Sequence, residues 1–324
     1  MPSATVPPAN LRVHFVSGVD GVQVERLCRV LDPRRALFIV SSKSFSTVET
    51  LLNARTLLQW FRARSLSVDE HWFAVTGNAQ AAERLGIPAR NVLNVPEWVG
   101  GRFSAWGAVG LPAALYLGWP VYQEWLDGGA EMDEHHASAP LEDNVPVRLA
   151  LLNVWHSSFL DCRSHCIASY DNRLSKFLTW AQQLEMESNG KRMTDDGRRV
   201  DYATAPIVWG GLGNDGQHTY YQLLREGTQR NAITLITVDD ASAALQEHAA
   251  ALARQAEAQA EALSSHEGGP AFNSVTHLRL RNLAPRSLGA LMSAFEHATT
   301  VSAWIWGINP FDQPGVELGK KLAA

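Results

Sequence analysis

A run of hydroxyl side chains follows an apolar stretch near the start of the chain. Residues 41–47 read Ser-Ser-Lys-Ser-Phe-Ser-Thr, between the apolar run 36–40 and a helical pattern at 47–64. A strand–turn–helix junction of this kind offers hydroxyl donors, backbone N–H groups and the positive end of a helix dipole, which together suit a phosphate. Lys43 could add a cation. The alternative is a cluster of N-cap residues without a ligand.

Arg102 follows a pair of glycines in the sequence Val-Gly-Gly-Arg-Phe-Ser at 99–104. Glycines at this place let the backbone approach a ligand closely, and Arg102 could then point into the space beside Gly101. The alternative is a tight turn with a surface arginine.

Glu187 lies in the sequence Met-Glu-Ser-Asn-Gly-Lys at 186–191, at the predicted end of a helix. A carboxylate held by a tight Ser-Asn-Gly turn is fixed well enough to act as a general base. The alternative is a solvated glutamate beside an ordinary C-cap glycine.

His218 ends the sequence Gly-Asn-Asp-Gly-Gln-His at 213–218. We expect this glycine-bracketed loop to open a helix with His218 in its first turn. A helix N-terminus favours the neutral, proton-accepting form of an imidazole. The alternative is a histidine that only caps or packs.

The last stretch of the chain carries two further candidates. Asp312 and Pro314 are helix-start signals. They place Gln313 at the mouth of a helix and Lys320 about two turns inside it. The alternative is a solvated C-terminal lysine.

Three cysteines, at positions 28, 162 and 166, exclude a disulfide framework and fit a reducing compartment. Cys162 and Cys166, near His156 and His165, have no second Cys/His pair to complete a metal site, so we interpret them as core residues at helical spacing. We therefore expect no metal. Walker, GxGxxG and nucleophile-elbow motifs are absent.

Composition narrows the class of protein. With 46% apolar and 19% charged residues, the chain is typical of a globular protein, and its net charge of −5 excludes a polyanion partner such as nucleic acid. The first residues do not resemble a signal peptide, and the uncharged stretch 103–122 is broken by glycines and prolines, which argues against a membrane span. We expect a cytoplasmic protein.

The elements that must position these residues follow an alternating β–α rhythm, which predicts an α/β fold with parallel sheets flanked by helices in three layers. Residues 103–164 are expected to be mostly helical. The predicted strands are 11–16, 36–40, 71–75, 91–95, 206–209, 233–236 and 275–280. The predicted helices are 21–30, 47–64, 172–184, 217–226, 241–263 and 286–297. The polar segment 131–144 predicts a boundary between a first domain at 1–138 and a second at 139–324.

Taken in order, these motifs resemble the glucose-6-phosphate isomerase family, within the sugar isomerase domain superfamily. The family's Ser-Lys-Thr-Phe-Thr-Thr loop is similar to residues 42–47, and its Val-Gly-Gly-Arg-Tyr-Ser to residues 99–104. Met-Glu-Ser-Asn-Gly-Lys is identical at 186–191, Gly-Gln-His is matched at 216–218 and Val-Glu-Leu-Gly-Lys at 316–320. The resemblance extends from about Leu11 to the last residue.

The resemblance implies a cofactor-free aldose–ketose isomerisation of glucose 6-phosphate and fructose 6-phosphate, a step of glycolysis and gluconeogenesis. Glu187 would carry a proton between C1 and C2 through a cis-enediolate, and Arg102 would stabilise the developing charge. His218 and Lys320 would help open the sugar ring, and Gln313 would line the site. The phosphate would be bound by Ser42, Ser44 and Thr47, with the backbone near Lys43 and Gly101.

The resemblance also implies a homodimer in which His218 reaches the partner's site. The chain starts at what corresponds to the family's second strand, so we expect the first domain to lack its first strand and a Gly-Ile-Gly-Gly-Ser phosphate loop. Three interpretations follow: a fragment of a longer isomerase, a shortened active enzyme, or a non-catalytic relic that binds sugar phosphates.

Overall fold

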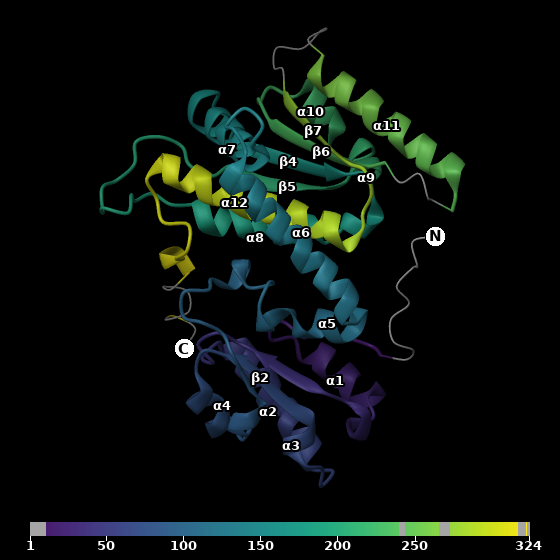
Figure 1. Ribbon diagram of the computed structural model, residues 1–324, viewed down its shortest axis with the longest axis vertical. Helices are drawn as coiled ribbons and strands as arrows, with labels where there is room; N and C mark the ends of the chain where they lie inside the picture. Colours follow the sequence, from purple (N-terminus) through teal and green to yellow (C-terminus); the bar gives the residue numbers. More distant parts are fainter. Residues whose placement is uncertain (1–10, 240–243, 266–272, 317–321, 323–324) are drawn as a thin grey trace. The chain divides into compact units, whose positions relative to one another are not determined.

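The computed structural model describes residues 11–239, 244–265, 273–316 and 322. These residues form two compact units (Figure 1). The N-terminal unit comprises 11–122 with Val316 and Leu322, and the C-terminal unit comprises the other described residues from Gln123 to Gly315. The units divide within the first turn of one helix, whereas the sequence placed a domain boundary at 138/139. That domain division stays a prediction.

The N-terminal unit is built on a parallel sheet in the order β1-β2-β3. Its main elements are α1 (Gly21–Val30), β1 (Phe38–Ser41), α2 (Val48–Arg62), α3 (Val68–His71), β2 (Trp72–Thr76), α4 (Ala79–Leu85), β3 (Val92–Asn94) and α5 (Leu111–Leu117). Strands β1 and β2 are apolar, and Phe38, Val40, Trp72 and Ala74 are buried in one core cluster with residues of α2. Phe38 stacks on Trp72 across the sheet, and Phe61 of α2 packs on both rings.

The strand expected at 11–16 is absent, and this prediction was wrong. Residues 11–17 have no regular structure, and Leu11 and Phe15 are 44% and 74% exposed. A β-branched run becomes a strand only where a neighbouring strand accepts its hydrogen bonds, and none among the described residues does so here. The strands expected at 36–40, 71–75 and 91–95 are confirmed as β1, β2 and β3 within one or two residues.

The C-terminal unit is built on a second parallel sheet, in the order β5-β4-β6-β7. Its elements are α6 (Trp119–Ser138, which starts before the unit boundary), α7 (Val145–Val154), β4 (Ser164–Ser169), α8 (Phe177–Asn189), β5 (Ile207–Leu212), α9 (Gly213–Gln217), α10 (Tyr221–Glu226), β6 (Ala232–Val238), α11 (Gln246–Ser264), β7 (Ser274–Leu280) and α12 (Pro285–Trp306). Figure 1 shows α10 and α11 on one side of this sheet and α8 and α12 on the other.

Strand β4 lies between β5 and β6 and was missed by the sequence analysis. Its side chains alternate between the two covered faces. Cys166 and Ala168 join an apolar cluster with residues of α10, β6 and α11, whereas His165 reaches the opposite face, toward α7 and α8. Two parallel sheets flanked by helices confirm the expected α/β fold class. Within the described ranges, no helix combines the length and the apolar character needed to cross a membrane.

Candidate functional site

The turn at 42–47 joins β1 to α2 at the carboxyl end of the first sheet. Thr47 is the N-cap residue of α2, but its side chain makes no capping hydrogen bond. Its hydroxyl oxygen instead lies 3.1 Å from the hydroxyl oxygen of Ser42, which is buried. The first N–H groups of α2 are therefore not used by this side chain. Such groups, at the positive end of a helix dipole, are what an anion binds.

The turn is held from behind by the segment that follows β2. Gly77 N–H and Thr76 Oγ1 both donate to the carbonyl oxygen of Lys43, at 2.9 and 3.0 Å, and Asn78 Nδ2 donates to Ser44 O at 3.3 Å. These bonds turn the carbonyl groups of the turn inward. The side chains of Lys43 and Ser44 are left exposed to solvent.

Phe45 anchors the same turn in the core. Its ring is 4% exposed, and its φ of 52° lies in the left-handed region that a non-glycine residue occupies at a cost of about 1–3 kcal/mol. Burial of the ring offsets that cost. The turn is therefore fixed in shape before any ligand binds, which lowers the entropy lost on binding.

Arg102 lies in the short 3₁₀ helix Gly101–Phe103 and is only 4% exposed. Its guanidinium carbon is 5.5 Å from the centre of the Phe103 ring. Ser104 Oγ donates to Gly101 O at 2.5 Å and closes the turn. The alternative of a surface arginine is thus excluded, because Arg102 is a largely desolvated charge in a fixed turn. A Cβ on Gly101 would meet no atom within 4 Å, so the space beside that residue is open.

Glu187 lies in the last turn of α8, at the end of a helix as the sequence predicted, although the helix continues through Ser188 and Asn189, where a tight turn was expected. The helix continues to Asn189 because that side chain is buried and donates to Thr299 O at 3.0 Å. The carboxylate of Glu187 accepts a hydrogen bond from Gln183 Nε2, one turn earlier, at 2.9 Å. A regular helix, with Gln183 on the same face, therefore positions this carboxylate.

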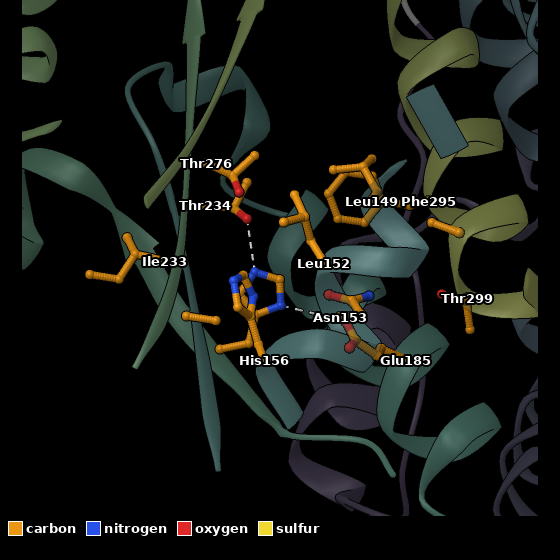
Figure 2. Close-up of a pocket in the computed structure, with 13 residues that line it drawn as sticks. Leu149, Leu152, Asn153, His156, Glu185, Ile233, Thr234, Thr276, Phe295 and Thr299 are labelled. Atoms are coloured by element: carbon orange, nitrogen blue, oxygen red, sulfur yellow. Dashed lines mark hydrogen bonds and ion pairs between the residues drawn. The ribbon is translucent and has the colours of Figure 1, made fainter. Parts of the chain in front are cut away.

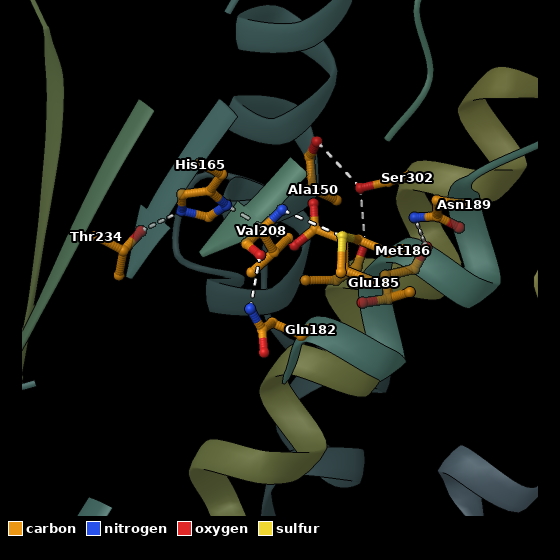
Figure 3. Close-up of polar contacts among 11 residues, drawn as sticks. Ala150, His165, Gln182, Glu185, Met186, Asn189, Val208, Thr234 and Ser302 are labelled. Atoms are coloured by element: carbon orange, nitrogen blue, oxygen red, sulfur yellow. Dashed lines mark hydrogen bonds and ion pairs between the residues drawn. The ribbon is translucent and has the colours of Figure 1, made fainter. Parts of the chain in front are cut away.

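Helix α8 is held against the second sheet by hydrogen bonds to both backbone groups of Val208, its carbonyl oxygen and its N–H. Gln182 Nε2 donates to Val208 O at 3.0 Å, and Val208 N–H donates to Met186 Sδ at 3.4 Å (Figure 3). Gln182 and Met186 lie close to Glu187 along the helix. Their bonds to Val208 therefore fix the position of the Glu187 carboxylate relative to the sheet.

Lys191 was missed as a site residue by the sequence analysis. Its side chain is 9% exposed, and its Nζ donates to the carbonyl oxygens of Glu187 and Ser188 at 3.1 and 2.7 Å. The same Nζ donates to the carbonyl oxygens of Asn309 and Asp312 at 3.0 and 2.9 Å. A lysine directly after an Asn-Gly pair at a helix end was the available signal, since cations favour helix C-termini.

His218 is not in the first turn of a helix, so that prediction was wrong. It is the C-cap residue of the five-residue helix α9, its N–H donates to Asp215 O at 3.1 Å, and its side chain is exposed. The argument from the positive end of a helix therefore does not apply. Helix α9 begins nearer the N-terminus than expected because Gly213 and Gly216 pack closely on tyrosine rings. A Cβ on Gly213 would lie 2.4 Å from the ring of Tyr170.

Gln313 is half-buried and directly precedes a helical stretch at 314–316, as expected from Asp312 and Pro314. Lys320 lies outside the described residues. The predicted residues thus divide between the two compact units. Ser42, Lys43, Ser44, Thr47, Gly101 and Arg102 belong to the N-terminal unit. Glu187, His218 and Gln313 belong to the C-terminal unit.

A buried polar cluster lies on the inner side of α8, around a cavity of about 20 Å³ (Figure 2). His165 Nε2 is 2.8 Å from Thr234 Oγ1, and His165 Nδ1 is 3.8 Å from Glu185 Oε2. His156 Nε2 is 2.7 Å from Ser274 Oγ. Burial, and then the neighbouring His165, lower the pKa of His156 to about 4. A cavity of this size has room for one water molecule, so the cluster is too small for a sugar ligand.

The helical spacing expected for Cys162 and Cys166 was wrong, because Cys166 lies on β4. Burial raises the pKa of its thiol to about 12, which makes Cys166 a poor nucleophile. Within the part of the chain that the structure describes, no three His, Cys, Asp or Glu side chains gather as metal ligands.

Comparison with known sequences gives one family. The chain matches the phosphoglucose isomerase family over residues 3–269 and 266–324. It is 43% identical over 323 residues to the glucose-6-phosphate isomerase of Polaromonas naphthalenivorans, covering 97% of this chain and 62% of that protein. It is 40% identical over 341 residues to that of Shewanella baltica, covering 96% and 63%. The chain therefore spans less than two thirds of the length of these curated relatives.

Solved structures agree with the fold. A glucose-6-phosphate isomerase from Chlamydia trachomatis superposes with a TM-score of 0.85 at 30% identity, over 98% of this chain and 64% of that chain. A hypothetical protein from Thermus thermophilus superposes with a TM-score of 0.82 at 32% identity, over 98% and 78%.

Proposed function

The chain belongs to the phosphoglucose isomerase family, and on that premise we propose that it interconverts glucose 6-phosphate and fructose 6-phosphate. The observation that carries the proposal is the family match over nearly the whole chain, because it includes both the 42–47 turn and the helix end that bears Glu187. In this role the protein would act in glycolysis and gluconeogenesis, in the cytoplasm.

Glu187 is the proposed general base. Its carboxylate removes the C2 proton of the open-chain aldose, and the electron pair moves toward the C1 carbonyl to give a cis-enediolate. A proton then moves from the C2 hydroxyl to the C1 oxygen, and return of the abstracted proton from Glu187 to C1 gives the ketose. The position of Glu187 on a regular helix, held by Gln183 and fastened to Val208 through its neighbours, supports this role because a base must keep its geometry through both transfers.

Arg102 is the proposed electrostatic partner of the enediolate. A guanidinium that has already lost most of its water stabilises a developing negative charge more strongly than a solvated one. Its 4% exposure supports this role. Gly101 leaves open space beside it, which suits the close approach of a ligand.

The turn at 42–47 is the proposed phosphate site. Ser42, Ser44 and Thr47 would supply hydroxyl donors, Lys43 a cation, and the start of α2 its N–H groups. The Thr47 hydroxyl bonds Ser42 and does not cap the helix, which supports a phosphate site over a simple N-cap cluster.

His218, Lys320 and Gln313 complete the proposal. His218 and Lys320 would protonate and deprotonate the ring oxygen and the C1 hydroxyl during ring opening, and Gln313 would line the site. We propose a homodimer in which His218 enters the partner's site. The exposure of His218 in the single chain is what a side chain donated to a second subunit requires.

The test is a coupled assay of fructose 6-phosphate conversion by the purified chain, with Glu187→Gln alongside. Glu134→Gln, a surface change on α6, is the matched control. We expect turnover by the parent and the control, and a loss of at least about 1,000-fold in kcat for Glu187→Gln. A folded parent chain that binds fructose 6-phosphate saturably but never turns it over would instead favour the alternative, a sugar-phosphate-binding relic.

A further inference from the structure

We infer that Lys191 is a positioning residue, which holds the end of α8 and the 309–312 segment in one arrangement and so places Glu187 relative to Gln313. The catalytic part of this inference rests on the proposed function. The geometric part rests on contacts within the C-terminal unit alone.

The end of α8 depends on Lys191 for its hydrogen bonds. The last four carbonyl groups of a helix have no partner within it. In α8, Gly190 N–H donates to Met186 O at 3.0 Å and Lys191 N–H donates to Asn189 O at 2.8 Å. The Lys191 ammonium donates to the two carbonyl oxygens between them, those of Glu187 and Ser188. The cation also lies at the negative end of the helix dipole, where it is stabilising.

The same ammonium also binds a second segment, residues 309–312, which lies far along the chain. It donates to the carbonyl oxygens of Asn309 and Asp312, and it pairs with the Asp312 carboxylate, with 3.2 Å between Nζ and Oδ1. The Lys191 side chain is 9% exposed, whereas that of Asp312 is 52% exposed. The backbone carbonyl groups, which are not free to rotate away, therefore form the stronger part of the link.

This link joins two of the predicted site residues through a single group. Lys191 bonds the backbone of Glu187 itself on one side. On the other side it bonds Asp312, the residue directly before Gln313. An ammonium has three N–H groups, and five oxygens lie within 3.2 Å of this one, so no neutral side chain could replace it. A purely structural cap would need only the bonds to α8.

The experiment compares Lys191→Met with Lys176→Met, the same change at an exposed lysine at the other end of α8. The first readout is amide hydrogen exchange over 184–190 and 308–315, where Phe311 N–H donates to Asn309 Oδ1 and reports on the segment. We expect exchange at both segments to speed up by about tenfold in Lys191→Met and to stay at the parent rate in Lys176→Met. This readout needs no activity.

The second readout separates positioning from folding. In Lys191→Met we expect kcat for fructose 6-phosphate to fall by about 10- to 100-fold, because small displacements of a base cost this much, with KM within about threefold of the parent. If Lys191→Met does not fold, Asp312→Asn removes only the ionic part of the link and should raise exchange at 308–315 alone, with a smaller fall in kcat.

Unchanged exchange at 308–315 in Lys191→Met, or in Asp312→Asn if that is the folded variant, would overturn the link. Faster exchange with unchanged kcat would reduce Lys191 to a structural cap and overturn its positioning role. If the parent chain itself lacks isomerase activity, the proposed function fails for this chain, and the exchange comparison still decides whether Lys191 joins the two segments.

Discussion

Ser42 and Thr47 are bonded to each other through their hydroxyl groups, 3.1 Å apart, across the turn between β1 and α2. A threonine at an N-cap normally accepts a hydrogen bond from the first turn of its own helix. Here the two hydroxyls bond each other instead. The N–H groups at the start of α2 therefore receive no hydrogen bond from the Thr47 side chain, and such groups are where an anion binds.

Replacing Thr47 with valine should therefore weaken substrate binding more than it weakens the fold. Valine keeps the shape and removes one donor to the phosphate, which is worth about 1.5–3 kcal/mol when the partner is charged. We expect KM for fructose 6-phosphate to rise by about tenfold or more with little change in kcat, because the phosphate is remote from C1 and C2. Steady-state kinetics measure both values.

Thr56→Val provides the control, because Thr56 lies on the same helix and bonds only Leu52 O among the described contacts. Its KM should match that of the parent. A Thr47→Val variant with normal KM but a loss of about 1–2 kcal/mol in the free energy of unfolding would mean that Thr47 acts as a cap after all.

Gly77 supports the same turn from behind, and Gly77→Ala should disturb it. A Cβ at this position would lie 2.9 Å from Val95 O and 3.4 Å from Lys43 O, and the nearer of these contacts is too short to exist without a backbone shift. We expect a loss of about 1–3 kcal/mol in the free energy of unfolding, measured in urea, together with a severalfold rise in KM. The shift would loosen the bond from Gly77 N–H to Lys43 O.

Gly21→Ala is the matched change for comparison, since a Cβ there meets no atom within 4 Å and the residue begins α1. It should be neutral or slightly stabilising, by less than about 1 kcal/mol. Equal effects of the two substitutions would show that the close contact with Val95 does not matter.

The sequence predicted continuous apolar strands well and missed β4 for a physical reason. Ser164–Ser169 has polar residues at both ends and a histidine inside, so it lacks the β-branched run typical of a strand. Two of its polar side chains have partners distant in sequence: His165 Nε2 lies 2.8 Å from Thr234 Oγ1, and Ser164 Oγ donates to Asn231 Oδ1. No local pattern contains those partners, and the sequence analysis therefore predicted no strand at these residues.

The candidate site shows the same division between local and distant information. The hydroxyl turn and the glutamate were predicted as site residues because their motifs are contiguous in the sequence. The helix α9 was placed wrongly because Gly213 and Gly216 looked like loop residues, whereas the structure uses them to admit the rings of Tyr170 and Tyr220. Lys191 was overlooked because its importance depends on Asn309 and Asp312, more than a hundred residues away.

The lowered pKa of His156 predicts how the free energy of unfolding depends on pH. Its pKa is lowered from 6.5 to about 4 in the folded chain, chiefly by burial. Between these values the unfolded chain binds a proton that the folded chain does not, so the free energy of unfolding falls as the pH drops from 6.5 toward 4. Above pH 6.5 the neutral His156 does not lower the free energy of unfolding. Acidification through this range lowers that free energy by at most about 3 kcal/mol.

Urea unfolding of the parent and of His156→Gln at pH 7, 6 and 5 measures this effect. The variant should lose less stability on acidification than the parent, because glutamine does not titrate. His248→Gln, at an exposed position on α11, should follow the parent. If all three proteins lose stability in parallel, His156 is not the group responsible.

The proposed exchange of His218 between subunits makes a quantitative prediction. Glu187→Gln and His218→Ala should each abolish most of the isomerase activity when purified alone. In a mixed dimer, the subunit with intact Glu187 receives intact His218 from its partner, and this site contains both groups. The other site of the same dimer contains both substitutions. After unfolding and refolding an equimolar mixture, half of the dimers are mixed, so activity should return to about a quarter of the parent's. No recovery, in a mixture that forms dimers as the parent does, would show that His218 serves its own subunit.

Mixing Glu187→Gln with Lys191→Met gives the contrast, because both changes lie on the same end of α8. Each mixed dimer then keeps one site with only the Lys191 change, so activity should stay well below a quarter.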